Sequence, residues 1–224
     1  MRGELIVLEG AEGAGKTTQL RMLSDRLHAA GIKALALREP GGTPLGDSIR
    51  ALLLDPVQQI EPEAEELLFM ASRAQIVRRE IDPALDSGVV VIMDRFFLST
   101  YAYQIYGRGL DQNRIRSANA LATGGLIPDL TLVLEIPAPD GLERISRRGA
   151  HDRIEGSGDA FHDRVEAAFA RFGRSDWQRE HPECGPIVTV DGRGSPEDVH
   201  SRVIRELARN LPQRFGDLFE AVES

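Results

Sequence analysis

The sequence predicts an α/β fold in which helices cover both faces of a parallel β-sheet. Three observations lead to this class. Short apolar runs of strand length alternate along the chain with longer segments whose apolar residues recur at helical spacing. Helical segments between strands are crossover connections, which join parallel strands. A glycine-rich turn also lies between the first apolar run and the first helical segment.

Five apolar runs are expected to form the strands. They are residues 5–8, 34–37, 89–93, 130–136 and 186–190. The third is the most continuous β-branched run of the chain, which suits a strand with both faces buried. The sheet is therefore expected to lie at the centre of the core.

Three helices are expected between the first three strands. The first follows the glycine-rich turn and ends at Gly31. Its apolar face is formed by Leu20, Leu23 and Leu27. The second helix is expected over residues 45–53 and a longer third one over residues 62–86. Pro83 should kink the last turn of the third helix, because proline has no N–H and crowds the preceding turn.

Composition and charge restrict the classes of function. The chain has 224 residues, of which 42% are hydrophobic and 28% charged, as in ordinary globular proteins. No apolar run approaches the ~20 residues of a membrane span. The net charge of −8 argues against binding a nucleic-acid polymer, which needs a basic surface. Any anionic ligand must be held by a local group of arginines and backbone amides.

Cysteine and histidine usage excludes two further kinds of site. The one cysteine, Cys184, can form no internal disulfide, and the five histidines fall in no spacing typical of a metal site or a catalytic triad. A reduced, cytoplasmic compartment fits this composition. We expect one domain over residues 1–212, with an Arg- and Gly-rich lid at about residues 147–158, and a C-terminal tail over residues 213–224.

The glycine-rich turn carries a phosphate-binding motif. Residues 10–17 read GAEGAGKT and fit the pattern G-x-x-x-x-G-K-[ST], directly after a strand and directly before a helix. The glycines let backbone N–H groups point inward at a phosphate, and the helix N-terminus adds free donors. Lys16 should reach the β- and γ-phosphates and Thr17 should bind Mg²⁺. The ATP-binding residues expected here are Gly10, Ala11, Glu12, Gly13, Ala14, Gly15, Lys16, Thr17 and Thr18.

A charged pair follows the third strand. Asp94 ends this strand, where a carboxylate suits the Mg²⁺ site, and Arg95 comes next. Ligands bind at the carboxyl edge of parallel sheets, and an arginine there suits bidentate contact with a phosphate. These residues leave the phosphoryl acceptor open: water, a protein or a small molecule.

Several segments, in this order and spacing, resemble the bacterial thymidylate kinases over nearly the whole chain. They are residues 9–19 (EGAEGAGKTTQ), 38–44 (REPGGTP), 72–75 (SRAQ), 94–104 (DRFFLSTYAYQ) and 152–155 (DRIE). The resemblance implies a three-layer P-loop NTPase fold with a five-stranded parallel sheet and a short arginine-rich lid. It also implies the reaction ATP + dTMP → ADP + dTDP with Mg²⁺, a step of dTTP biosynthesis, in a homodimer.

The resemblance also implies how dTMP is bound. Phe69 and Arg73, four residues apart on one helix face, would stack on the thymine and hydrogen-bond its carbonyl. Thr100 and Gln104 resemble polar positions at the base edge, and Tyr103 a ring that favours deoxyribose.

Further charged residues are implied around the sugar and the acceptor phosphate. Glu12 resembles an acidic residue near the sugar 3′-hydroxyl. Arg38, Arg50 and Arg95 resemble arginines around the acceptor phosphate. The segment Glu39-Pro40 lies in this tight loop and could form a cis peptide bond.

The expected catalysis is positioning combined with cationic stabilisation. A phosphate monoester is already anionic and needs no general base, and the sequence shows no nucleophile–base arrangement. The expected catalytic cations are Lys16, Arg95, Arg148 and Arg153, the last two closing over the phosphates with the lid and excluding water.

Two other functions stay open at this point. A kinase for another nucleoside monophosphate is one; a deoxynucleoside kinase would in addition need a carboxylate base, for which Glu9 or Glu12 is the loop candidate. A P-loop ATPase that switches its binding to a protein partner is the other.

Overall fold

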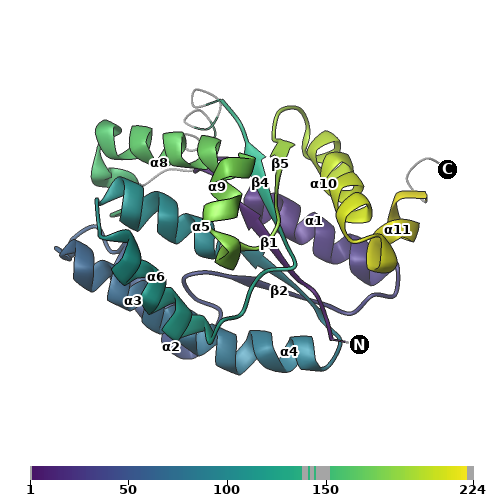
Figure 1. Cartoon of the computed structure of the whole chain (residues 1–224), viewed down its shortest axis with the longest axis horizontal. Helices are drawn as coiled ribbons and strands as arrows, with labels where there is room; N and C mark the ends of the chain where they lie inside the picture. The colour runs from purple at the N-terminus through teal and green to yellow at the C-terminus, as the bar shows by residue number, and fades with distance from the viewer. Residues whose placement is uncertain (1, 138–140, 142–143, 145–151, 221–224) are drawn as a thin grey trace.

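A computed structural model describes residues 2–137, 141, 144 and 152–220. Its centre is a five-stranded, fully parallel sheet with the strand order β2-β3-β1-β4-β5 (Figure 1). The strands are β1 (Leu5–Glu9), β2 (Ala34–Arg38), β3 (Val90–Asp94), β4 (Leu130–Glu135) and β5 (Ile187–Asp191). The predicted fold class and the five predicted strands are confirmed.

The register aligns the carboxyl ends of β1, β2 and β3. Arg38 lies beside Asp94 across β2 and β3, and Leu8 lies beside Asp94 across β1 and β3. The residues that follow these strands therefore share one carboxyl edge of the sheet, where ligands bind in open α/β folds.

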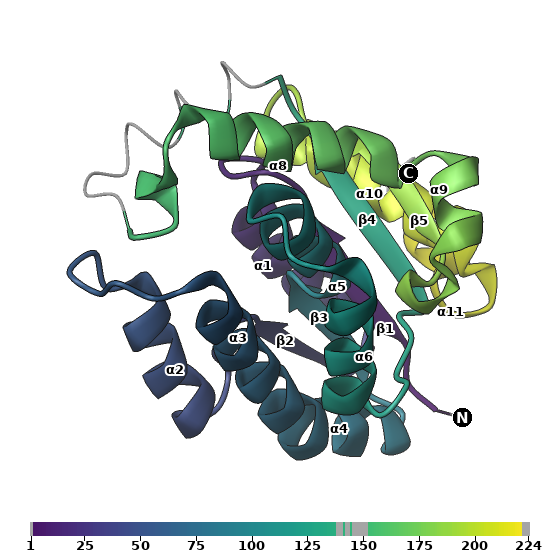
Figure 2. The same ribbon diagram turned by 60° about the vertical axis from the view of Figure 1, so that its left-hand side comes forward.

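Helices form a layer on each face of the sheet (Figures 1 and 2). One layer consists of α1 (Lys16–Ala29), α10 (Pro196–Asn210) and α11 (Pro212–Glu220). The other contains α3 (Pro62–Ile76), α4 (Asp82–Asp86), α5 (Phe97–Thr100), α6 (Gln112–Thr123), α8 (Asp159–Phe172) and α9 (Ser175–Glu180). Helix α2 (Pro44–Leu54) packs against α3. Both layers bury their apolar faces against the sheet, as expected for this architecture.

The third predicted helix, residues 62–86, is irregular in its C-terminal part. A π-helical segment, η1 (Val77–Ile81), joins α3 to α4 directly before Pro83. The expected disturbance thus lies in the turn that precedes the proline, where a ladder hydrogen bond is missing.

A second π-helical segment, η2 (Tyr101–Gly107), continues α5. It places most of its side chains in the interior, Tyr103 and Gln104 among them. Segments of this kind are frequent at functional sites. Short 3₁₀ segments, η3 (Glu155–Ser157) and η4 (Pro182–Cys184), complete the elements.

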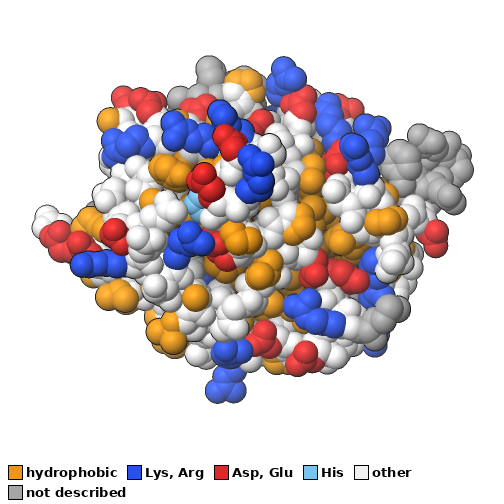
Figure 3. Space-filling model, in the orientation of Figure 1, with side chains coloured by type: hydrophobic (Ala, Val, Ile, Leu, Met, Phe, Trp, Pro, Cys, Tyr) orange, Lys and Arg blue, Asp and Glu red, His pale blue; other side chains and the backbone are white. Residues whose placement is uncertain are grey.

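The C-terminal helix α11 belongs to the core as far as Leu218. Phe215 and Leu218 of α11 are buried in the same cluster as α1 and α10, and Arg26 donates to the Leu218 carbonyl at 3.0 Å. Of the helices in the described ranges, none has the length and hydropathy to cross a bilayer. On the face shown in Figure 3, Lys and Arg side chains lie among Asp and Glu side chains.

Candidate active site

A cavity of about 270 Å³ opens at the carboxyl edge of the sheet. It runs from the glycine-rich turn to α3 and η2, with residues 152, 154 and 155 on its rim. The predicted site residues that line it are Glu12, Gly13, Gly15, Lys16, Thr17, Arg38, Arg50, Phe69, Arg73, Asp94, Arg95, Thr100, Tyr103 and Gln104. The structure therefore places most of the residues expected for ATP and for the acceptor around one continuous space.

The glycine-rich turn has a backbone that only glycine adopts easily. Gly10 has φ 144°, and a Cβ there would lie 2.5 Å from the Leu134 carbonyl oxygen. Gly15 has φ 93° and caps α1. Gly15, Lys16 and Thr17 line the cavity, so the free N–H groups of the first turn of α1 lie at the end expected to hold a polyphosphate.

Lys16 lies folded back on this turn. Its Nζ donates to the carbonyl oxygens of Gly10 at 2.9 Å and Ala11 at 2.8 Å. Burial, and next the nearby Arg95, lower the pKa of Lys16 to about 7. An anionic ligand would offset both effects and restore the charge of the ammonium.

Thr17 and Asp94 form the pair expected at the metal ion. The Thr17 hydroxyl donates to Asp94 Oδ2 at 2.7 Å. Both groups are hard oxygen donors, which suit Mg²⁺. No group of three or more His, Cys, Asp or Glu side chains in the described ranges could hold a metal by itself. These two residues therefore fit an ion that also takes oxygens from phosphates and water.

Arg95 has an unusual backbone. Its φ is 73°, and among the described residues it is the one non-glycine with a left-handed φ. The guanidinium donates to Ser99 Oγ at 3.0 Å and to the Tyr103 hydroxyl at 3.2 Å. Burial alone would lower the pKa of Arg95, but the acidic groups of Tyr103 and Asp94 outweigh it and raise the pKa. Arg95 is therefore a permanent cation on the cavity wall.

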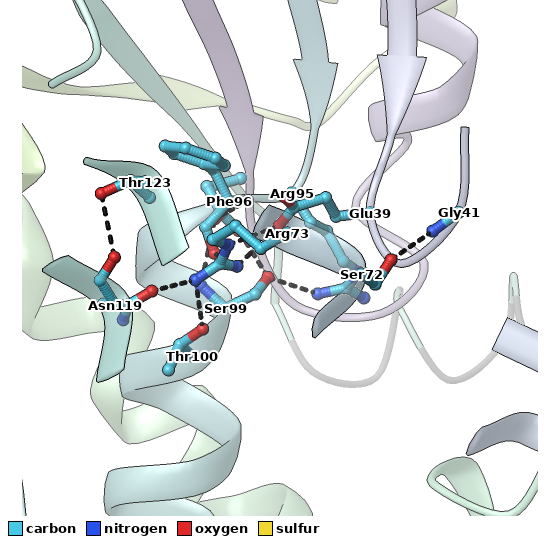
Figure 4. A network of polar contacts seen from close by, with 11 residues as sticks. Glu39, Gly41, Ser72, Arg73, Arg95, Phe96, Ser99, Thr100, Asn119 and Thr123 are labelled. Atoms are coloured by element: carbon cyan, nitrogen blue, oxygen red, sulfur yellow. Dashed lines mark hydrogen bonds and ion pairs between the residues drawn. The ribbon is translucent and has the colours of Figure 1, made fainter. Parts of the chain in front are cut away.

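Arg73 is the centre of a buried network (Figure 4). Its Nε donates to Glu39 at 2.8 Å, its Nη1 to Thr100 at 2.9 Å and to Asn119, and its Nη2 to the Phe96 carbonyl at 2.9 Å. Nη2 also lies 2.6 Å from Glu39 Oε2. Every nitrogen of the guanidinium already has a partner in the protein. The base contact expected for Arg73 stays a prediction, and would need one of these bonds to be shared.

The residues expected at the base and sugar have polar partners as well. The Tyr103 hydroxyl donates to Glu12 at 3.3 Å. Gln104 Nε2 donates to Glu65 at 3.2 Å. Thr100 and Gln104 are both buried on the cavity wall. Their side chains are therefore held in place before any nucleotide binds, and their roles toward the base stay predictions.

Arg38 and Arg50 lie on the cavity wall near the loop after β2. The Arg50 guanidinium donates to the Pro40 carbonyl at 3.0 Å, and Arg38 lies 3.9 Å from Asp47. Burial, and next Arg38, lower the pKa of Arg50. The Glu39–Pro40 peptide bond is cis. Two cations thus face the part of the cavity expected to hold the acceptor phosphate.

Of the two lid arginines expected to be catalytic, the structure describes Arg153. Arg148 lies outside the described residues. Arg153 is not among the residues that line the cavity. Its Nε donates to the Leu53 carbonyl at 2.8 Å and its Nη2 to Glu65 at 2.6 Å. In this structure Arg153 therefore connects the lid to α2 and α3, and its expected contact with the phosphates stays a prediction.

Sequence reasoning missed several polar residues that hold the site. Glu39, Glu65, Ser99 and Asn119 each bond to a predicted site residue. Glu39 lies between Arg38 and Pro40 in the segment REPGGTP, and this position was a signal that could have identified it. Glu65 had a weaker signal, an acid on the buried side of a helix.

The fold and the cavity together define a P-loop nucleotide kinase, with a phosphate-binding turn at one end of a cavity and a cationic acceptor pocket at the other. The similarity of this chain to known proteins agrees with this class. The family model described as thymidylate kinase matches residues 8–203. The chain belongs to the thymidylate kinase family.

Curated relatives and a solved structure cover most of the chain. A thymidylate kinase of Carboxydothermus hydrogenoformans is 47% identical over 199 residues, 89% of this chain and 94% of its own. One of Deinococcus radiodurans is 49% identical over 178 residues, 80% of this chain and 86% of its own. The crystal structure of thymidylate kinase from Ehrlichia chaffeensis has a TM-score of 0.72 and 30% identity, covering 92% of this chain and all of that chain.

Proposed function

We propose that this chain transfers the terminal phosphoryl group of ATP to dTMP, giving ADP and dTDP, with Mg²⁺ as the metal ion. Membership of the thymidylate kinase family supports this reaction. The observation that carries the proposal is the single cavity that joins Lys16 and Thr17 to Arg95 and to the pocket of Phe69 and Arg73. Two nucleotides can meet end to end in such a space.

Each end of the cavity has a distinct task. The N–H groups of the turn and Lys16 hold the β- and γ-phosphates of ATP. Arg95, with Arg38 and Arg50 beside it, holds the phosphate of dTMP by charge-assisted hydrogen bonds. Phe69 offers a ring for the thymine to stack on. Catalysis then follows from placing the acceptor oxygen in line with the γ-phosphorus.

Thr17 and Asp94 would hold Mg²⁺, which would supply positive charge against the phosphates of ATP. The acceptor is already anionic, so no residue of the chain has to remove a proton from it. Arg95 keeps its positive charge throughout and stabilises the charge that spreads over the transferring group.

The contacts of Glu9 argue against a deoxynucleoside kinase. That reaction needs a carboxylate base at the acceptor hydroxyl. The Glu9 carboxylate is fully buried and accepts hydrogen bonds from Phe96 N, Ser99 N and the Ser99 hydroxyl. Glu12 lines the cavity but interacts with Tyr103. We therefore favour the monophosphate as acceptor.

Two further features belong to the proposal. We propose a homodimer, supported by Leu67 on α3 and Leu121 on α6, which expose 65% and 86% of their surface on two helices that pack together. We also propose a cytoplasmic location, because ATP and deoxynucleoside monophosphates are intracellular metabolites.

An ADP-release assay with dTMP, dUMP, dCMP, dGMP and thymidine tests the function. The highest kcat/KM is expected with dTMP, and no turnover above background with thymidine. Turnover of thymidine without turnover of dTMP would show a nucleoside kinase. Slow ADP release that no acceptor stimulates would show an ATPase switch.

A further inference from the structure

Glu9 is a buried carboxylate that the transfer reaction itself does not use. It ends β1 directly ahead of the phosphate-binding turn, has no exposed surface and is not among the residues lining the cavity. It accepts from Phe96 N at 2.7 Å, from Ser99 N at 3.0 Å and from Ser99 Oγ at 2.7 Å. A carboxylate buried this deeply is costly unless it is hydrogen-bonded, and these three bonds satisfy it.

The donors of these three bonds follow Arg95 closely in the chain: Phe96 is the next residue and caps α5, and Ser99 lies within α5. The left-handed φ of Arg95 is unfavourable for any residue with a Cβ and persists only when its surroundings fix it. The residue before Glu9 fixes one side, because Arg95 N donates to the Leu8 carbonyl at 3.0 Å. Glu9 fixes the other side through Phe96 N. The end of β1 therefore clamps the backbone of Arg95 from both directions.

Ser99 extends this control to the Arg95 side chain. Its hydroxyl donates to Glu9 Oε2, so its lone pairs are free to accept from Arg95 Nη1 at 3.0 Å. Figure 4 shows Arg95 and Ser99 facing each other beside the Arg73 network. The carboxylate of Glu9 thereby orients the Ser99 hydroxyl, and the hydroxyl oxygen in turn holds Nη1 of the Arg95 guanidinium.

We propose that Glu9 is a positioning residue that acts through Ser99 and the Phe96 amide to hold Arg95 in the orientation that receives the acceptor phosphate. Gly10 follows Glu9, so the end of β1 fixes both the phosphate-binding turn and Arg95 and thereby sets the distance between them. This proposal rests on the proposed role of Arg95.

Steady-state kinetics of Glu9→Gln and Ser99→Ala test the proposal. The amide presents a donor where one of the three bonds needs an acceptor, and alanine removes the link to the guanidinium. Each variant is expected to lose about 10- to 100-fold in kcat/KM for dTMP, with the KM for ATP changed less than about twofold. Glu66→Gln, the same change at a buried carboxylate outside the cavity lining, is the matched control and should keep its kcat/KM.

A double-mutant cycle separates positioning from mere structural support. In an Arg95→Ala background, Glu9→Gln or Ser99→Ala should lower kcat/KM for dTMP by less than about twofold further, because both act through the missing guanidinium. Full losses that persist in that background would overturn the proposal. If Glu9→Gln fails to fold, Ser99→Ala carries the same cycle, because it leaves both backbone bonds to Glu9 intact.

The same cycle distinguishes this proposal from the one on which it rests. Arg95→Ala that keeps wild-type kcat/KM for dTMP would overturn the role of Arg95 itself. A strongly impaired Arg95→Ala, combined with single Glu9 and Ser99 variants of wild-type activity, would overturn only the positioning role of Glu9.

Discussion

Arg153 of the lid forms a buried ion pair with Glu65 of α3. Arg153 Nη2 lies 2.6 Å from Glu65 Oε2, and the two side chains expose 12% and 1% of their surface. Glu65 also accepts from Arg108 and from Gln104, and these bonds from Arg108 and Arg153 outweigh burial and lower the pKa of Glu65. One carboxylate thus joins the lid to a residue on the wall of the base pocket.

This pair predicts that Arg153 and Glu65 act together. Arg153→Ala should lower kcat more than it weakens binding of ATP or dTMP, because the lid loses its attachment to α2 and α3. Glu65→Gln should lower kcat similarly, and the double variant should lose little more than the worse single variant. Stopped-flow or steady-state kinetics measure this. Unchanged kcat in Arg153→Ala would remove the residue from catalysis, and a Glu65→Gln variant with wild-type kcat would point to direct phosphate contact by Arg153.

Lys16 predicts proton uptake when ATP binds. In the free protein its pKa is about 7, so most molecules carry a neutral amine at pH 8. The bound polyphosphate favours the ammonium, so MgATP binding at pH 8 should take up about one proton, and the affinity should fall as the pH rises above 7.

Calorimetry in buffers of different ionisation enthalpy measures this uptake, without dTMP. Lys16→Arg is the control, since a guanidinium keeps its charge and any remaining binding should take up none. A wild-type binding enthalpy at pH 8 that is independent of the buffer would show that the ammonium is charged before ATP arrives.

The sequence predicted the sheet and the phosphate-binding turn because these depend on local pattern, whereas the residues of the acceptor pocket were expected from the resemblance to a known family. Five apolar runs read as strands, and Asp94 and Arg95 follow one of them, so the sheet edge had to bring them to the turn. The π-helical form of residues 101–107 has no such pattern, because it depends on packing against α8. Thr100 and Gln104, which were expected from the resemblance to a known family, both line the cavity.

The supporting carboxylates could not be predicted in the same way. Glu9, Glu39 and Glu65 are separated from the groups they hold by 34 to 90 positions of sequence. For Glu65 the position on a helix face was only a weak signal, because an acid within a helix is usually solvated and the tertiary structure decides its burial. Arg73 was expected to face the base. Its many hydrogen-bond partners in the protein could not be predicted, because they lie far from it in the sequence and come together only in the fold.

Glu66 predicts a pH-dependent change in stability. Both of its carboxylate oxygens are buried without a hydrogen-bond partner among the described residues, and burial raises its pKa from 4.5 to about 7. Between these values the folded state holds a proton that the unfolded state has released, so the contribution of Glu66 to stability falls as the pH rises through this window. Above pH 7 the cost is complete, at about 3 kcal/mol.

Glu66→Gln should therefore raise the melting temperature at pH 8 and leave it nearly unchanged at pH 4.5. Thermal unfolding followed by circular dichroism measures both. A gain of equal size at the two pH values would mean that the pKa of Glu66 is the same in the folded and unfolded states, and would contradict this account.

Arg73 and Glu39 predict a loss of stability together with a loss of dTMP binding. Arg73→Ala leaves the Glu39 carboxylate buried and unpaired, and Glu39 Oε1 already has no partner among the described residues. Burial raises the pKa of Glu39 even with Arg73 present. Breaking such a pair should cost about 3–5 kcal/mol. The cost should be larger at pH 8 than at pH 5, because protonation of Glu39 relieves the buried charge and its pKa rises further without Arg73.

Urea unfolding of Arg73→Ala and of the double variant Glu39→Gln with Arg73→Ala separates the two effects. The double variant should regain much of the stability, because no charge stays buried, yet its KM for dTMP should remain raised with ATP binding spared. If the double variant recovers the KM as well as the stability, Arg73 supports the pocket through Glu39 alone and does not contact the base. If neither variant changes the KM for dTMP, the thymine lies elsewhere in the cavity and the pairing of Phe69 with Arg73 loses its role.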